Sequence, residues 1–425
     1  MRRKLLLLVA IHLVSLSANA NPVAPISLNI ENNATADKPV AATTLHGRDA
    51  RLQLLVAGKL PNGSHVDATH SVTYSVQPAG ILNVESSGLA TPLANGTATV
   101  TATNETGHSA TTVINVTGMD EELPVSFATQ VVPIFTKLGC NGGGCHGKSA
   151  GQNGFRLSLL GFDPRADYEH IVRESRGRRA SLAAPDQSLL LLKAINASPH
   201  GGGQRLEKDS HEYRLMRRWV ATGMPYGSGK EPTVQSIEVY PRQRRLAKNS
   251  KQQLTAVAHL SDGSVEDITR AAVFESNDTE MAEVTATGLV ELKTLVGDVS
   301  VMARYQGHVD VFRADIPLGA TDDWPETKWP EQRNVVDRYV FGKLKSLGIP
   351  PAGECDDATY LRRVTLDIAG RLPTLDEVTD FEQSTDPEKR TKLVNRLLSS
   401  DDYASYFARK WITILRNRRT SGELQ

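Results

Sequence analysis

Residues 54–69 read LLVAGKLPNGSHVDAT, and residues 254–269 read LTAVAHLSDGSVEDIT. The second stretch repeats fixed positions of the first at an offset of 200: Leu54, Leu60, Gly63-Ser64, Asp67 and Thr69. The correspondence continues along both stretches, at Val84, Gly88-Leu89 and Gly107-His108. The chain therefore contains two copies of one module, which flank an unrelated insert.

Each copy has the pattern of short β-strands. Ala98, Val100 and Ala102 alternate with polar residues, which is the period of a strand with one buried face. Asn62-Gly63 and Asp262-Gly263 lie between apolar runs and predict hairpin turns. We therefore expect two all-β immunoglobulin-like sandwiches, over residues 25–117 and 234–316.

The repeated pattern resembles the group 2 bacterial immunoglobulin-like domain. The resemblance rests on Leu-x-Asn/Asp-Gly-Ser, the Asp-x-Thr that follows it, and the later Gly-Leu. It implies modules that act as spacers or as adhesive surface domains. Neither copy contains a cysteine, so we interpret both as rigid spacers in preference to ligand sites.

The composition excludes several classes of protein. A length of 425 residues indicates more than one domain. The 48 Lys and Arg residues balance 48 Asp and Glu residues, so the chain lacks the basic excess of a nucleic-acid-binding protein. Three cysteines are too few, and odd in number, for a disulfide-stapled scaffold. Of these, Cys355 is interpreted as a lone thiol without a role.

The first twenty residues, MRRKLLLLVAIHLVSLSANA, predict a signal peptide. A basic start precedes an apolar run that is too short to span a bilayer, and Ala18-Asn19-Ala20 fits a cleavage site. We expect a protein exported to the periplasm or the cell surface, with no transmembrane span in the mature chain.

The insert contains the residues with distinctive chemistry. Apolar residues over 127–138 recur at helical spacing, which predicts a helix with a kink at Pro133. The sequence CNGGGCHG follows at 140–147. Its nearest relative is the C-x-x-C-H motif, in which two thiols attach haem and the histidine binds its iron. Here four residues separate Cys140 from Cys145, three of them glycines that allow a tight loop.

The cysteine loop alone leaves other interpretations open. One is a disulfide between Cys140 and Cys145, which an exported protein could form. A second is a zinc site of Cys140, Cys145, His146 and a distant histidine. A third is a thiol redox pair, although such pairs normally have the C-x-x-C spacing.

The sequence around the loop resembles the planctomycete-type cytochrome c family over about 120–228. The matching runs are GQNGFRLSL (151–159), GFDP (161–164), RGRR (176–179), PDQSLL (185–190), PHGGG (199–203) and WVATGMP (219–225). The four-residue gap between the cysteines departs from the family's motif and affects the attachment chemistry more than the fold. The resemblance implies an all-α cytochrome c-like haem module over 119–230.

The same resemblance implies one haem c, attached through Cys140 and Cys145, with His146 as the proximal iron ligand. It places His200 where the family carries its distal ligand, so His200 is our first choice. Met224, in a loop after the predicted helix Ser210–Thr222, is the second. Met216 shares the apolar face of that helix and is interpreted as a core residue.

Basic residues cluster after the haem-binding motif, at Arg173, Arg176, Arg178 and Arg179. Such a patch can steer an acidic redox partner or pair with haem propionates, but a solvated face is the more common explanation.

The end of the chain is predicted to be all-α. Residues 317–331 contain three prolines and are interpreted as a linker. Over 332–425 apolar residues recur at helical spacing, and Thr374-Leu375-Asp376-Glu377 fits a capping box. This stretch resembles the helical domain of unknown function that accompanies planctomycete-type cytochromes. In that family the chain runs on, so we interpret the domain as incomplete.

These patterns favour an exported electron-transfer protein with a haem and a redox partner protein, and indicate an electron carrier more than an enzyme. Two alternatives stay open. One is a structural or adhesive cell-surface protein without haem, whose cysteines form a disulfide. The other is an exported enzyme whose C-terminal helical domain is catalytic and receives electrons from the haem.

Overall fold

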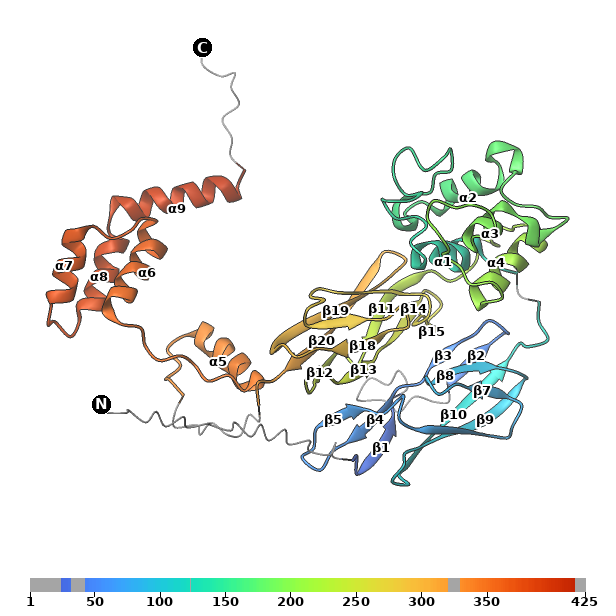
Figure 1. The fold of residues 1–425 in the computed structure, drawn as a ribbon, viewed down its shortest axis with the longest axis horizontal. Helices are drawn as coiled ribbons and strands as arrows, with labels where there is room; N and C mark the ends of the chain where they lie inside the picture. Colours follow the sequence, from blue (N-terminus) through green and yellow to red (C-terminus); the bar gives the residue numbers. More distant parts are fainter. Residues whose placement is uncertain (1–23, 32–42, 123, 320–328, 417–425) are drawn as a thin grey trace, which may run out of the picture. The chain divides into compact units, whose positions relative to one another are not determined.

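The computed structural model describes residues 24–31, 43–122, 124–319 and 329–416. The predicted signal peptide and most of the predicted linker lie outside these ranges. The described residues divide into two compact units. The larger unit takes its residues from 1–326 and 333–349, and the smaller unit from 327–332 and 350–425. The larger unit contains the strands of both repeats and the insert between them (Figure 1).

The first repeat forms three small sheets, with strand orders β1-β4-β5, β2-β10-β9-β6 and β3-β8-β7. Their inward side chains form the core, in which Leu54, Val100 and Ile114 are fully buried. The strands are β1 (Ser27–Ile30), β2 (Thr43–His46), β3 (Leu52–Gln53), β4 (Val56–Lys59), β5 (His65–Asp67), β6 (Thr73–Gln77), β7 (Leu82–Val84), β8 (Leu89–Pro92), β9 (Gly96–Thr103) and β10 (Ser109–Thr117). The predicted alternation is observed, since Ala98, Val100 and Ala102 of β9 all point into the core.

The second repeat has the same topology. Its sheets run β11-β14-β15, β12-β20-β19-β16 and β13-β18-β17, each the counterpart of a sheet in the first repeat. The strands are β11 (Val234–Tyr240), β12 (Gln243–Arg245), β13 (Lys251–Gln253), β14 (Thr255–Leu260), β15 (Val265–Asp267), β16 (Val273–Ser276), β17 (Ala282–Val284), β18 (Leu289–Leu292), β19 (Gly297–Tyr305) and β20 (His308–Ile316). The sequence repeat is therefore a repeat of fold, as predicted.

The two sandwiches contact each other through the same residues of each copy. The backbone N–H of Gln53 donates to Oδ2 of Asp267 at 2.7 Å, and the N–H of Gln253 donates to Oδ2 of Asp67 at 2.6 Å. A second pair of contacts has the same symmetry: Arg270 to the Gln53 side chain at 2.8 Å, and His70 to the Gln253 side chain at 3.1 Å. The arrangement is that of an isologous dimer interface, built here within one chain.

The insert is helical and has its own core. Its helices are a π-helical turn at Phe127–Val131, α1 (Val132–Lys137), α2 (Pro164–Val172), α3 (Leu189–Ala194) and α4 (His211–Ala221), with short 3-10 turns between them. Phe127, Ile171 and Trp219 are fully buried in this core. The helix predicted over 127–138 is observed as a continuous run, π-helical over Phe127–Val131 and α-helical over Val132–Lys137, and Pro133 lies where the helix changes type.

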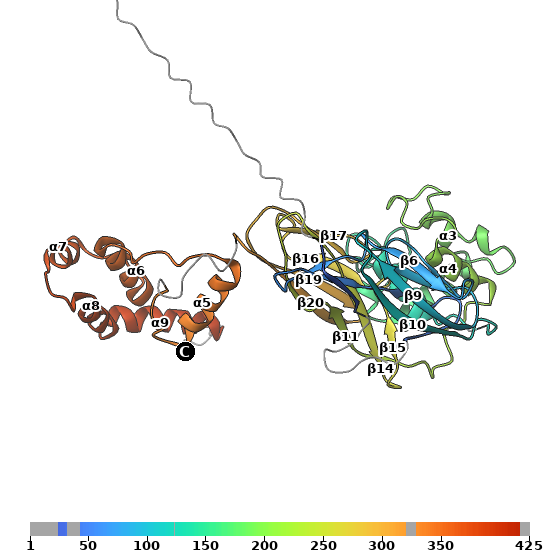
Figure 2. The same cartoon turned by 90° about the horizontal axis from the view of Figure 1, so that it is seen from below.

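The C-terminal helices also follow the sequence signals. The helix α5 (Val335–Leu347) belongs to the larger unit and ends at Gly348 in the left-handed conformation. The smaller unit is a bundle of α6 (Asp357–Ala369), α7 (Leu375–Gln383), α8 (Lys389–Leu398) and α9 (Asp401–Ile414) (Figure 2). Thr374 and Glu377 form the predicted capping box at the start of α7.

Candidate functional site

The cysteine loop folds back on itself directly after α1. The backbone N–H of His146 donates to the carbonyl of Cys140 at 3.0 Å, which brings the residue after the second cysteine back to the first. Gly147 makes this return possible, because a Cβ at that position would lie 2.0 Å from the Asn141 carbonyl oxygen. The loop therefore holds Cys140, Cys145 and His146 together as one compact turn.

The cysteines are free thiols. Cys140, Cys145 and Cys355 are all partly buried and form no disulfide in this structure. Burial raises the pKa of Cys140 to about 11, and Arg205 only partly opposes this effect. Because thiol exchange requires a thiolate, the environment of Cys140 does not favour a redox pair. Among the described residues, no group of three or more His, Cys, Asp or Glu is placed to hold a metal ion.

His146 is fixed by the segment that follows the loop. Its Nδ1 lies 3.0 Å from the carbonyl oxygen of Phe155, and its ring packs against the Phe155 ring at a centroid distance of 4.5 Å. The backbone carbonyl of His146 accepts a hydrogen bond from the N–H of Leu157 at 2.8 Å. Burial lowers the pKa of His146, which favours the neutral imidazole that metals bind.

His200 is held in the same way. Its Nδ1 lies 2.8 Å from the carbonyl oxygen of Gly203. Gly202 leaves room for the ring, since a Cβ there would lie 3.0 Å from Cε1 of His200. The rings of His200 and His146 are 6.3 Å apart and their planes differ by only 7°. Two histidines 54 positions apart in sequence are thus brought together in parallel.

The two hydrogen bonds determine which nitrogen is available for a ligand. A carbonyl oxygen only accepts, so Nδ1 of each ring donates the hydrogen bond and Nε2 is the nitrogen left to bind a ligand. The ring centroids are 6.3 Å apart with the planes stacked, so two such nitrogen-bearing rings are brought to one place.

The two methionines lie in the core of the insert. Met216 is 1% exposed, as expected of a core residue. Met224 is 8% exposed, and its backbone is fixed by hydrogen bonds to the Trp219 carbonyl at 2.9 Å and from the Tyr168 hydroxyl at 2.8 Å. His200 lies in a ring pair with His146. Among the described residues, no comparable arrangement is observed for Met224, the second predicted ligand.

The basic run does not form one surface patch. Arg173, Arg176 and Arg178 are exposed, but Arg179 is only 9% exposed. The interpretation of all four as one solvated or partner-binding face is therefore wrong for Arg179. Its partners are the carbonyls of His170 and Glu174, nine and five positions away, and the carbonyl of Gly154, 25 positions away.

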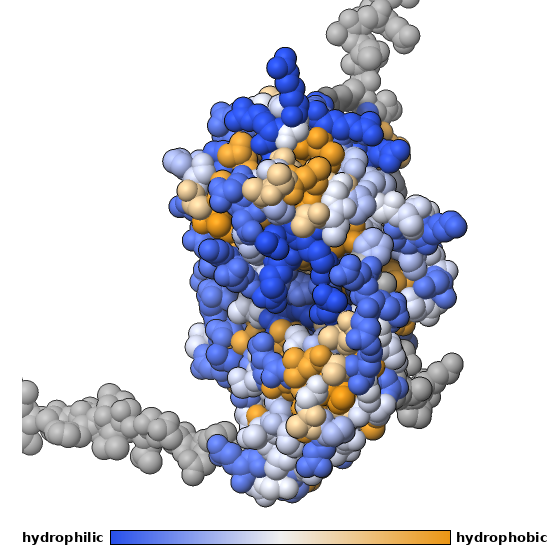
Figure 3. Space-filling view, turned by 90° about the vertical axis from the view of Figure 1, so that its right-hand side faces the viewer, coloured by the Kyte–Doolittle hydropathy of each residue, from blue (hydrophilic) through white to orange (hydrophobic). Residues whose placement is uncertain are grey.

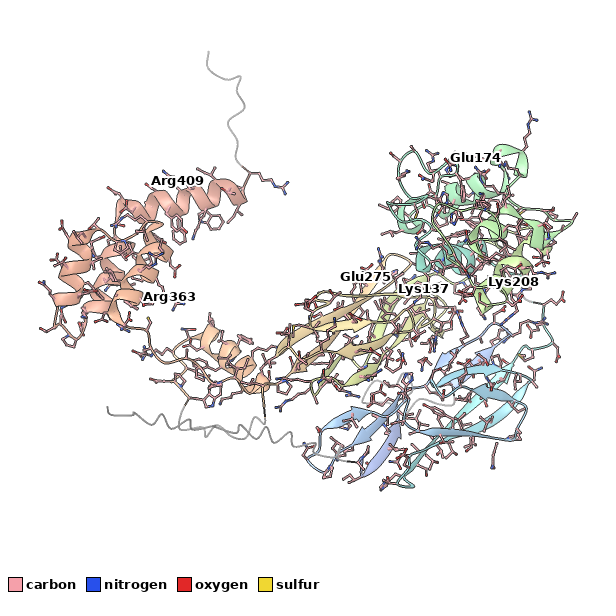
Figure 4. The ribbon with its side chains drawn as sticks, viewed as in Figure 1. Lys137, Glu174, Lys208, Glu275, Arg363 and Arg409 are labelled. Carbon is pink, nitrogen blue, oxygen red and sulfur yellow. The ribbon has the colours of Figure 1, made fainter. Side chains whose placement is uncertain are left out.

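A second candidate site is a cavity of about 970 Å³ where both sandwiches and the insert meet. Figure 3 shows hydrophilic side chains gathered around a hollow. The charged side chains pair across the junction, with Arg51 and Glu212 2.7 Å apart and Arg218 bound to Asp49. Lys137 of α1, labelled in Figure 4, donates to the carbonyls of Ala272 and Ala286 in the second sandwich. These contacts hold the modules together, and none resembles a set of reacting groups.

Comparison with known families assigns only the C-terminal part. Residues 335–425 match the family PSCyt2, described as a protein of unknown function (DUF1549). This agrees with the resemblance stated for the C-terminal helical domain. No curated protein matches the sequence.

The similar solved structures include domains of an S-layer protein and a titin Ig tandem. Domains 5–6 of the S-layer protein SbsC match at 10% identity and a TM-score of 0.25, over 65% of this chain and 94% of that one. The S-layer protein rSbsC(31-844) matches at 11% identity and a TM-score of 0.18, over 70% of this chain but only 28% of that one. The titin Ig tandem A164-A165 matches at 9% identity and a TM-score of 0.14, over 68% and 96%. At these TM-scores the matches support no functional inference.

None of the described helices is both long enough and apolar enough to cross a membrane.

Proposed function

We propose that the protein is an exported c-type cytochrome-like electron carrier. One haem is attached through Cys140 and Cys145, with His146 as proximal and His200 as distal iron ligand. The observation that carries the proposal is the parallel pair of imidazoles, 6.3 Å apart, each with Nδ1 held by a backbone carbonyl.

The donor set fits haem better than a metal ion held by protein alone. Two imidazoles from separate segments lie near two free thiols, and these are the groups that a c-type haem requires. The cysteine loop lies beside one of the two rings, because His146 directly follows Cys145 and hydrogen bonds to Cys140. When bound, the haem would supply an iron that gains and loses one electron.

The chain's own groups define what such a site does. His146 and His200 would both hold the iron, and the function that this pair supports best is transfer of an electron to a redox partner protein. The carbonyls of Phe155 and Gly203 keep the protons on Nδ1 and orient both rings. The predicted signal peptide places this activity in the periplasm or at the cell surface.

The axial ligands are tested by replacing them one at a time in the haem-loaded protein. We expect His200→Ala to convert a low-spin spectrum to a high-spin one, because the iron loses a ligand. Met224→Leu is expected to leave the spectrum unchanged, and Met216→Leu is the matched control, since both methionines are buried. A low-spin spectrum that survives His200→Ala and is lost in Met224→Leu would reverse the assignment.

A further inference from the structure

Arg179 is buried within the insert, although Arg176 and Arg178 are exposed. Its guanidinium donates to the carbonyl of His170 at 2.6 Å and to the carbonyl of Gly154 at 2.8 Å. Glu174, labelled in Figure 4, has its carboxylate 3.9 Å from the guanidinium. A buried arginine with these partners joins the end of α2 to the segment around Gly154.

The same guanidinium covers one face of an aromatic ring. Its central carbon lies 4.7 Å from the centroid of the Phe155 ring, which in turn lies 4.5 Å from the ring of His146. The Phe155 carbonyl also holds Nδ1 of His146. Phe155 is therefore in contact with Arg179 through its ring and with His146 through both its ring and its backbone.

The segment that presents Phe155 is a short turn. Gly151 and Gly154 adopt positive φ, and the N–H of Gln152 donates to the Phe155 carbonyl at 2.8 Å while the N–H of Phe155 donates to the Gln152 carbonyl at 3.0 Å. These bonds close the turn on itself, and neither of them involves the Phe155 ring. Arg179 supplies a charge-assisted hydrogen bond to the residue before Phe155 and a cation–π contact to the ring.

We propose that Arg179 is a positioning residue that sets the orientation and the tautomer of His146 through Phe155. The inference rests on the proposed role of His146 as an iron ligand and adds the group that orients it. The contribution of Arg179 is geometric, because a planar guanidinium reaches three carbonyls, those of His170, Glu174 and Gly154, and one ring at once. A lysine carries the same charge but cannot reproduce this fork.

The chain offers a matched control one position away. Arg178 is exposed and carries the same charge, so Arg178→Gln changes the net charge of the insert as Arg179→Gln does. Arg179→Lys keeps the charge and removes the fork. The three variants therefore separate a geometric role from an electrostatic one.

In the haem-loaded full-length protein, we expect Arg179→Gln and Arg179→Lys to shift and broaden the low-spin electron paramagnetic resonance signal in the same way. Arg178→Gln should leave it as in the wild type. A wild-type signal in Arg179→Lys, or an equal change in Arg178→Gln, would overturn the geometric role.

A second readout needs no haem. In the apo protein, we expect the exchange of the His146 Nδ1 proton, followed by NMR, to quicken about tenfold in both Arg179 variants, which corresponds to about 1.4 kcal/mol. If Arg179→Gln fails to fold, Phe155→Leu provides the test, because it removes the ring and leaves Arg179 in place. Unchanged exchange of the His146 Nδ1 proton in Phe155→Leu would refute the proposal. A wild-type protein that binds no haem would contradict the proposed function. The exchange measurement on the apo protein would still test the role of Arg179.

Discussion

Replacing Asp267 by alanine tests whether the two sandwiches are held together by their reciprocal contact. One oxygen of Asp267 accepts the N–H of Thr269 at 2.7 Å within the same module, and the other accepts the N–H of Gln53 at 2.7 Å from the other module. Asp267→Ala removes both acceptors at once. The N–H groups have no access to water, since Gln53 is 2% exposed and Thr269 is fully buried.

The expected loss follows from these contacts. A buried donor left without a partner costs about 1–3 kcal/mol, so two such groups cost roughly 2–6 kcal/mol. Part of this is offset, because burial raises the pKa of Asp267, and the variant no longer buries that carboxylate. We therefore expect a net loss of about 2–3 kcal/mol at the contact between the modules.

Hydrogen exchange at the Gln53 amide measures this loss locally. A change of about 2 kcal/mol corresponds to a roughly thirtyfold faster exchange. Asp67→Ala should produce the same effect at the Gln253 amide, because the contact is reciprocal. The control is Asp262→Ala, which affects an exposed turn carboxylate bound to Ser264. Unchanged exchange at Gln53 in Asp267→Ala, or equal acceleration in the control, would refute the reasoning.

Two further predictions concern the insert. Gly147→Ala should prevent haem attachment, because its Cβ would collide with the Asn141 carbonyl. The control is Gly144→Ala, whose Cβ meets no atom within 4 Å and should be tolerated. The measurement is haem per polypeptide, and equal haem content in both variants would contradict the prediction. Burial, then the nearby arginines, lower the pKa of Lys137 from 10.5 to about 8. Lys137 therefore binds its proton more tightly in the unfolded chain than in the folded protein. The free energy of unfolding should rise by about 3 kcal/mol as the pH is raised from 8 to 10.5. Urea unfolding of Lys137→Met should lack this rise, and its persistence would refute the assignment.

The fold was largely predictable because its signals are local. Hairpin glycines such as Gly63, the alternation around Val100 and the capping box at Thr374 each act within a few residues. Such signals predict elements and their order. They do not predict the contact of Gln53 with Asp267, because the partners are 214 positions apart and nothing in either stretch specifies the other.

The candidate site was predictable in part. The loop from Cys140 to His146 is visible in sequence, and the resemblance of the PHGGG run nominated His200. The parallel arrangement of the two rings depends on packing between segments that no periodicity connects. Arg179 was misinterpreted for the same reason, since one of its partners is the carbonyl of Gly154, 25 positions away.

Covalent haem attachment tests the central claim most directly. The full-length protein is expressed in a host with haem-attachment machinery, unfolded in denaturant and separated from free haem. The account predicts that one haem per chain stays with the polypeptide and is lost when Cys140 and Cys145 are both replaced by serine. A colourless polypeptide with Cys140 and Cys145 joined in a disulfide would contradict it.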